Sequence, residues 1–146
     1  GEPVPMLREL FEVLQGKDLY INLEFKTNKI HDEGIEAIVL ALAKEYHFVH
    51  PIIFSSFNYQ TLKNCQRIDP YQQYCFLTKK PILWPKHFVK KNHFVAIHPH
   101  WYEPSKVTQR IWTIDNPRLA KRYFKLGVAG IFTNNFELMN EVKERL

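Results

Sequence analysis

The amino-acid sequence predicts an α/β protein built on a sheet of parallel strands. Three observations support this fold class: strand-like and helix-like segments alternate along the chain, the strands are short and apolar, and many helices begin or end at a recognisable signal. Six strands, nearly all separated by helices, indicate a sheet covered on both faces, either open or rolled into a barrel. With 146 residues and no internal repeats, the chain is expected to form a single domain, residues 1–146.

Each predicted element has its own signature. Helices are expected where apolar residues recur every three or four positions, and glycine, asparagine or proline marks several helix ends. The predicted helices cover residues 7–14, 35–42, 58–68, 85–91, 116–127 and 135–146, and the predicted strands cover residues 20–25, 51–57, 74–77, 94–100, 110–114 and 127–133. Asn58, Asn116 and Asn135 are placed to cap three of these helices.

The composition excludes several classes of protein. It is 45% apolar and 24% charged, as in an ordinary soluble globular protein, and the longest apolar run, residues 37–43, is far shorter than the roughly 20 residues of a membrane-spanning helix. Cys65 and Cys75 are too few for a disulfide framework or a zinc site. We therefore expect a cytoplasmic protein with no transmembrane segment, in which both thiols lie in the core.

The net charge of +5 raises the question of nucleic-acid binding. Residues 79–93 interleave five lysines with Trp84 and Phe88, which is typical of a surface that binds phosphates and stacks on bases. A helix over residues 85–91 with solvated lysines accounts for the same pattern, and no nucleic-acid motif accompanies it. We expect no nucleic-acid partner.

The segment Asp18–Lys26, "DLYINLEFK", is the first candidate for a functional site. Its alternation places Asn22, Glu24 and Lys26 on one face of a strand. If this strand is central in a covered sheet, a carboxylate and an ammonium on it need each other, a metal or a ligand. A structural Glu24–Lys26 pair stays open, but the carboxyl end of a parallel strand is also where barrel active sites are assembled.

The ends of the predicted strands carry further motifs. In chain order they read "INLEFK" (21–26), "IIFSSFNYQTLKNC" (52–65), "AIHPHW" (96–101), "IWTIDNP" (111–117) and "LGVAGIFTN" (126–134). In that order and register they resemble the glycerophosphodiester phosphodiesterase family, whose members are (β/α)8 barrels that hydrolyse deacylated phospholipids. The lead-in "PVPMLRELFEVL" (3–14) is similar to the helix before the family's Glu-x-Lys strand.

The resemblance implies roles for individual residues. Glu24 matches a carboxylate ligand of the family's divalent metal, Ca²⁺ or Mg²⁺, both of which prefer oxygen donors. Lys26 matches the residue that contacts the substrate phosphate, where a point charge on a flexible stem is suited to developing negative charge. Trp112 matches the tryptophan that forms a wall of the substrate pocket, and Asp115 matches the Asn or Asp at the pocket rim.

His98 and His100 are expected at the pocket mouth. Their i, i+2 spacing on a strand also fits a pair of metal ligands, but the family's metal site is built from carboxylates, so a structural role is favoured for both. The family's two catalytic histidines come from motifs that precede its Glu-x-Lys strand, and these motifs are missing from the 146 residues. We therefore expect no catalytic residue in this chain and place the catalytic histidines upstream of Gly1.

The count of elements leads to the same interpretation. A closed barrel has eight strand–helix units and about 250 residues, so six predicted units correspond to the C-terminal part of a (β/α)8 TIM-type barrel. Residues 102–109 are also too short for the helix that the family usually carries between "HPHW" and "RIWTID". Open barrel edges would favour a homodimer or a segment swap.

Two hypotheses for function follow. In the first, the parent protein hydrolyses glycerophosphodiesters to sn-glycerol 3-phosphate and an alcohol with the help of a metal, and this chain carries part of the site. In the second, the chain is a non-catalytic truncated barrel that binds a phosphate ligand or a partner.

Overall fold

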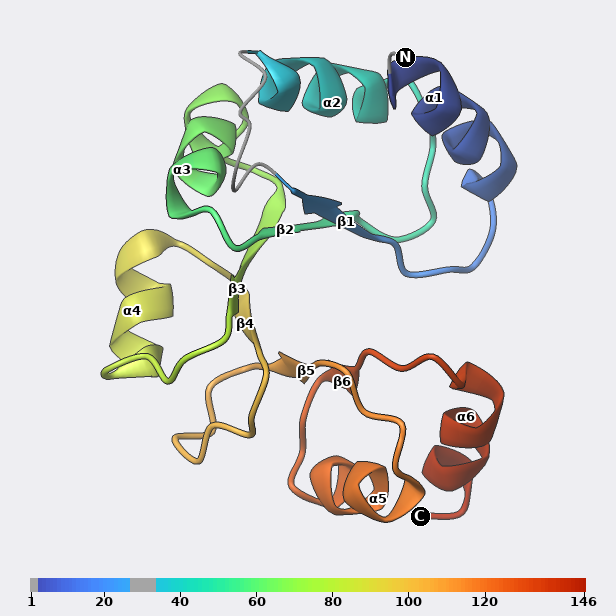
Figure 1. Cartoon of the computed structure of the whole chain (residues 1–146). Helices are drawn as coiled ribbons and strands as arrows, with labels where there is room; N and C mark the ends of the chain where they lie inside the picture. Colours follow the sequence, from blue (N-terminus) through green and yellow to red (C-terminus); the bar gives the residue numbers. More distant parts are fainter. Residues whose placement is uncertain (1–2, 27–33) are drawn as a thin grey trace. The chain divides into compact units, whose positions relative to one another are not determined.

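The computed structural model describes residues 3–26 and 34–146 (Figure 1). Within them, six helices and six strands follow one another in the predicted order. In chain order they are α1 (Pro3–Leu14), β1 (Asn22–Phe25), α2 (Ile35–Lys44), β2 (Ile53–Ser56), α3 (Tyr59–Ile68), β3 (Gln73–Thr78), α4 (Pro85–Asn92), β4 (Ala96–Pro99), β5 (Arg110–Ile111), α5 (Pro117–Lys125), β6 (Gly130–Ile131) and α6 (Phe136–Glu144). No helix separates β4 from β5, as expected from the short connection.

The predicted caps explain where several helices begin. The side chain of Asn58 accepts a hydrogen bond from the backbone N–H of Thr61, and Asn135 accepts one from Leu138. Asn116 accepts two backbone hydrogen bonds before Pro117, which opens α5. These bonds satisfy N–H groups that have no partner inside the helix, so the helix starts were readable from the sequence.

The chain falls into two compact units, Gly1–Cys75 and Phe76–Leu146, and strand β3 crosses the boundary between them. In the first unit, β1 and β2 pair in parallel from Asn22 opposite Ile53 to Phe25 opposite Ser56. Helices α1 and α2 pack together and α2 packs against α3.

The first unit has an aromatic core. Phe11 of α1 makes edge contacts with Tyr46 and Phe48, at ring-centroid distances of 5.8 and 5.2 Å. Phe54 of β2 lies 5.9 Å from the ring of Tyr74, and both side chains are buried. Such pairs contribute beyond the area that they remove from water, so they hold α1 against the segment after α2 and β2 against β3.

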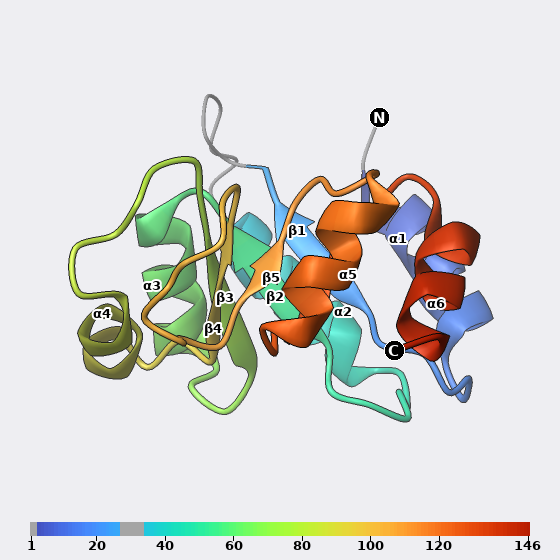
Figure 2. The ribbon, with the colours of Figure 1, turned by 90° about the horizontal axis from the view of Figure 1, so that it is seen from below.

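In the second unit, β5 and β6 pair in parallel, with Arg110 opposite Gly130 and Ile111 opposite Ile131. Ile97 of β4 forms a further parallel bridge with Gln109. Helices α5 and α6 lie side by side (Figures 1 and 2). The apolar faces of these helices and the neighbouring strand residues form one core. Its buried members are Ile111, Ile114, Ala120, Tyr123 and Met139. Because Ile111 points into this core, its strand neighbour Arg110 faces the opposite side of β5.

Two further expectations can be compared with the structure. Cys65 and Cys75 lie in the core and form no disulfide, as predicted. Strands β5 and β6 have two residues each, shorter than the predicted ranges 110–114 and 127–133, because the chain leaves the hydrogen-bonded ladder soon after Ile111 and Ile131. No helix in the described part of the chain is long and apolar enough to cross a membrane.

Candidate functional site at the strand ends

The carboxyl end of β1 presents the predicted polar residues. Glu24 is half-buried, Asn22 and Lys26 are exposed, and Phe25, on the other face, is buried. The exposure of Asn22 and Lys26 differs from the burial expected for a central strand covered on both faces. Among the described residues, neither Glu24 nor Lys26 has a hydrogen-bond or ion-pair partner, so no Glu24–Lys26 pair forms.

Two serines of β2 hold this end of β1 in place. The parallel register sets Ser55 beside Glu24, and the buried Ser55 hydroxyl donates to Asn22 Oδ1 at 3.1 Å. The Ser56 hydroxyl donates to the Phe25 carbonyl at 2.8 Å and accepts from the N–H of Asn58 at 3.0 Å. The "SS" of the predicted strand therefore ties the residues around Glu24 to β2 and to the start of α3.

In the second unit, His98 of β4 is fully buried. Its Nε2 lies 3.2 Å from Nη1 of Arg110, and because a guanidinium only donates, Nε2 accepts and Nδ1 carries the hydrogen. Nδ1 is buried without a hydrogen-bond partner. Burial, and then the nearby Arg110 charge, lowers the pKa of His98 to about 3, so this imidazole is neutral near pH 7.

His100 and Trp112 are joined by a hydrogen bond and by ring contact. Nδ1 of His100 lies 3.0 Å from the Trp112 carbonyl, which can only accept, so Nδ1 donates. The Trp112 indole N–H in turn donates to the carbonyl of His98 at 2.8 Å. The His100 ring also lies 4.5 Å from the Trp112 ring and 4.9 Å from that of Trp101. The predicted pocket residues at 98, 100 and 112 therefore lie together in this unit.

Asp115 is exposed, and both of its carboxylate oxygens accept hydrogen bonds from the loop that follows β6. Its Oδ1 accepts from the Thr133 hydroxyl and the Asn134 N–H, both at 2.8 Å, and its Oδ2 accepts from the Asn134 side chain at 3.1 Å. The Asn134 backbone bond, followed by the two side-chain bonds, lowers the pKa of this carboxyl. Asp115 therefore fastens the loop after β5 to the loop after β6.

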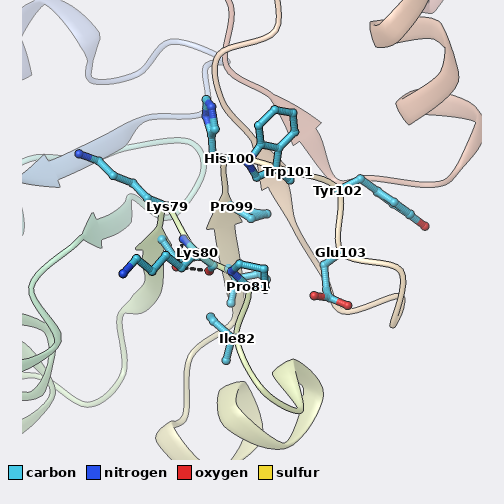
Figure 3. Close-up of a pocket in the computed structure, with 11 residues that line it drawn as sticks. Lys79, Lys80, Pro81, Ile82, Pro99, His100, Trp101, Tyr102 and Glu103 are labelled. Atoms are coloured by element: carbon cyan, nitrogen blue, oxygen red, sulfur yellow. Dashed lines mark hydrogen bonds between the residues drawn. The ribbon is translucent and has the colours of Figure 1, made fainter.

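A hollow lies at the ends of β3 and β4 in the second unit (Figure 3). Its walls come from the ends of these strands and from the loops after them, and they are formed by Thr78, Lys79, Lys80, Pro81, Ile82, Ile97, Pro99, His100, Trp101, Tyr102 and Glu103. Sequence reasoning singled out only His100 as a pocket residue here, although Lys79, Lys80 and Trp101 lie in the motifs that it quoted. It also missed Arg110, whose guanidinium lies 3.2 Å from His98 Nε2.

The fold and these strand-end residues define an α/β protein of the parallel-strand barrel class. The family model described as "Glycerophosphoryl diester phosphodiesterase family" matches residues 1–138. The chain belongs to this family, as its strand-end motifs predicted.

Known proteins are similar along most of this chain. A glycerophosphodiester phosphodiesterase of Caldanaerobacter subterraneus subsp. tengcongensis is 30% identical over 155 residues, covering 99% of this chain and 64% of the relative. The structure of a proposed glycerophosphoryl diester phosphodiesterase from Silicibacter pomeroyi DSS-3 superposes with a TM-score of 0.83 and 21% identity, covering 95% of this chain and 56% of that one.

A third similar protein is a phosphodiesterase from Oleispira antarctica, whose structure is a complex with the product sn-glycerol-3-phosphate. It superposes with a TM-score of 0.72 and 19% identity, covering 86% of this chain and 56% of that one. At these identities the structural similarity establishes the fold, a partial TIM-type barrel. The chain spans less than two thirds of the length of the three relatives described here.

The resemblance implied a divalent metal, and the residues present can be tested against that expectation. In residues 3–26 and 34–146, no group of three or more His, Cys, Asp or Glu side chains is arranged to hold a metal ion. Ca²⁺ takes about six to eight oxygen ligands, and Mg²⁺ needs a near-octahedral set. Glu24 supplies one carboxylate, so the described residues by themselves do not form a metal site.

Proposed function

We propose that the protein to which this chain belongs hydrolyses glycerophosphodiesters to sn-glycerol 3-phosphate and an alcohol. The observation that carries this proposal is the family match over residues 1–138, together with Glu24 and Lys26 at the end of β1 where the family has its Glu-x-Lys motif. The complex of the Oleispira antarctica phosphodiesterase with sn-glycerol-3-phosphate supports the class of product. Two buried cysteines that form no disulfide support a cytoplasmic location.

Within this proposal, the strand-end residues have separate roles. Lys26 contacts the substrate phosphate, and its exposed ammonium is available for that contact. Trp112 forms a wall of the substrate pocket, since its indole is held by the His98 carbonyl and its backbone carbonyl by His100. Asp115 acts at the rim by holding two loops together.

Glu24 is proposed as one ligand of Ca²⁺ or Mg²⁺, which would polarise the phosphoryl oxygens when bound. Such a cation would need oxygen donors besides those that the described residues offer. The neutral, buried His98 does not suit proton transfer near pH 7.

The test is the turnover of glycerophosphocholine and glycerophosphoethanolamine by the complete protein and its Glu24→Gln variant, followed as release of sn-glycerol 3-phosphate. The variant removes the charge and keeps the shape, so we expect turnover to be abolished. Glu9→Gln, at an exposed position of α1 in the same unit, is the matched control and should retain activity. Near-normal activity of Glu24→Gln would contradict the assigned role of Glu24, and an inactive wild-type protein would contradict the proposed function.

The incomplete donor set around Glu24 favours a second candidate, a non-catalytic module that binds a phosphate ligand or a partner. The two proposals differ in their response to metal. A protein that binds a cation only when folded is stabilised by it, so millimolar Ca²⁺ or Mg²⁺ should raise the melting temperature of the enzyme and leave that of the module unchanged.

A further inference from the structure

The loop after β3 and helix α4, both in the second unit, carry charge of one sign. From Phe76 to Tyr102 the chain has five lysines and no Asp or Glu, whereas the net charge of the whole chain is only +5. The side chains of all five are exposed; they are Lys79, Lys80, Lys86, Lys90 and Lys91. A positive segment without acidic residues attracts polyanions, which include nucleic acids and the head groups of anionic lipids.

Helix α4 packs beside β3 and β4 and directs its lysines outward (Figure 1). Its inner face is held by Phe88, whose ring lies 5.4 Å from that of Phe76 and 5.7 Å from that of Phe94. Lys86 and Lys90 are one turn apart on the opposite face, and both are exposed. The aromatic contacts therefore fix which side of α4 faces solvent.

Two apolar side chains are exposed to solvent directly before this helix. Leu83 is 75% exposed and Trp84 is 71% exposed. The backbone is fixed on both sides of them, because the Thr78 hydroxyl donates to the Lys80 carbonyl at 2.6 Å and the Trp84 carbonyl accepts from the N–H of Phe88 at 2.9 Å. Adjacent large apolar side chains in water, bordered by lysines, indicate a surface that a partner covers.

Two kinds of polyanion fit the charge, and the apolar side chains distinguish between them. Proteins that bind single-stranded nucleic acid stack successive bases on exposed aromatic rings. Phe88 does not offer such a ring, because it packs against Phe76 and Phe94, and Leu83 has no ring. Tryptophan and leucine beside lysines are typical of a surface that binds an anionic bilayer, where the lysines meet the head groups and the apolar side chains enter the interface.

We propose that the loop after β3 and helix α4 form a docking surface for an anionic lipid bilayer. Leu83 and Trp84 enter the interface, and Lys86, Lys90 and Lys91 bind the lipid head groups. In barrels of parallel strands, the loops that follow the strands lie at the edge where ligands bind. Docking through the loop after β3 therefore holds that edge at the membrane surface, and it goes beyond the hydrolytic activity proposed above.

The test is co-sedimentation of the complete protein with two kinds of vesicle, phosphatidylcholine alone and phosphatidylcholine with phosphatidylglycerol in equal parts. We expect binding to the anionic vesicles only, and weaker binding as salt is raised, because salt screens the attraction. The double variant Lys86→Gln/Lys90→Gln should lower the affinity about 30-fold, at about fivefold for each lysine. Lys121→Gln/Lys125→Gln, an exposed pair with the same spacing on α5 of the same unit, is the matched control and should bind like the wild-type protein.

A second pair of variants tests the apolar part of the surface. Trp84→Ser should lower the affinity for anionic vesicles about tenfold, because the indole no longer leaves water on binding. Phe136→Ser is the control: it removes a ring that is 66% exposed at the start of α6 in the same unit and should leave the affinity unchanged.

Loss of binding in Lys86→Gln/Lys90→Gln and in Trp84→Ser, with both controls unaffected, supports the proposal. Absence of wild-type binding, equal binding to both kinds of vesicle, or equal weakening by the two lysine pairs overturns it. Binding of a single-stranded oligonucleotide without binding to anionic vesicles also overturns it and identifies a nucleic-acid surface. Because vesicle binding is measured without substrate, none of these outcomes affects the proposed hydrolysis.

Discussion

The two units of the chain hold their strand-end polar residues in different ways. In the first unit, the side chains of Glu24 and Lys26 have no hydrogen-bond or ion-pair partner among the described residues, and only the strand beneath them is fastened by Ser55 and Ser56. In the second unit, Asp115 accepts three hydrogen bonds and His98 is buried beside Arg110.

This difference indicates two roles for polar residues at the ends of parallel strands, ligand binding and structural support. A charged group with unused hydrogen-bonding capacity on a fixed strand can bind a ligand without losing an internal contact. A group whose bonds are already made holds loops or strands in position, and removing it changes stability before it changes binding. We therefore expect substitution of the strand-end charge of Lys26, unpaired among the described residues, to affect activity, and substitution of the engaged residues His98 and Asp115 to affect stability and its pH dependence.

The largest effect is expected at Lys26. If this ammonium contacts the phosphate, Lys26→Met should lower kcat/KM by about 10²- to 10³-fold, as for other groups that stabilise developing negative charge. Stability should change little, because the side chain is exposed. Steady-state release of sn-glycerol 3-phosphate measures the first effect and thermal unfolding the second. Lys17→Met, at an exposed position before β1, is the control, and equal activity of the two variants would remove Lys26 from the site.

The second prediction concerns His98 and acid. Its folded-state pKa of about 3 lies below the ordinary value of 6.5, because burial and then Arg110 disfavour the charged imidazole. Below pH 6.5 the His98 imidazole is protonated in the unfolded chain but stays neutral in the folded chain, so stability is lost as pH falls from about 6.5 towards about 3. The loss is up to roughly 5 kcal/mol. His98→Asn should remove this component, measured as the unfolding free energy in urea at pH 7 and pH 4.

His87→Asn provides the control for that measurement, because His87 is exposed on α4 of the same unit. It should keep the acid dependence of the wild-type protein. An unchanged dependence in His98→Asn would show that the buried imidazole is not its source.

The third prediction uses two serines, one in each unit. Ser55→Ala removes a buried donor to Asn22 and should cost roughly 1 kcal/mol of unfolding free energy. The hydroxyl of Ser105 is buried without a hydrogen-bond partner, so Ser105→Ala should be neutral or slightly stabilising. Chemical denaturation of both variants measures this contrast. A larger loss in Ser105→Ala than in Ser55→Ala would contradict the hydrogen-bond assignments.

The smallest effect is expected at Asp115. Because its hydrogen bonds lower the folded-state pKa of the carboxyl, its contribution to stability is present above the unfolded-state pKa and is lost as pH falls through the folded-state value. The wild-type protein should therefore unfold at a higher temperature than Asp115→Asn at pH 7, and the difference should shrink towards pH 2. Glu137→Gln should show no such convergence, and a constant difference at Asp115 would argue against the pKa shift.

Local sequence signals predicted the elements of the fold well. Asn58, Asn116 and Asn135 cap the helices that they were expected to cap, because a cap needs only its own side chain and the next few N–H groups. The alternation in residues 21–26 placed Glu24 and the buried Phe25 on opposite faces of β1. The strand-end motifs, read in order, were sufficient to indicate the family.

The sequence by itself therefore determined the order of helices and strands, the helix starts and the family. Only the tertiary structure decided that the guanidinium of Arg110 lies within hydrogen-bond distance of His98 and that Asp115 accepts hydrogen bonds from Thr133 and Asn134. It also decided that the loops after β3 and β4 enclose a hollow. The hydrogen-bonded contacts join residues that are 12 to 19 positions apart in the sequence. They depend on the register between strands and on the paths of loops, and no periodicity within one segment encodes either of these.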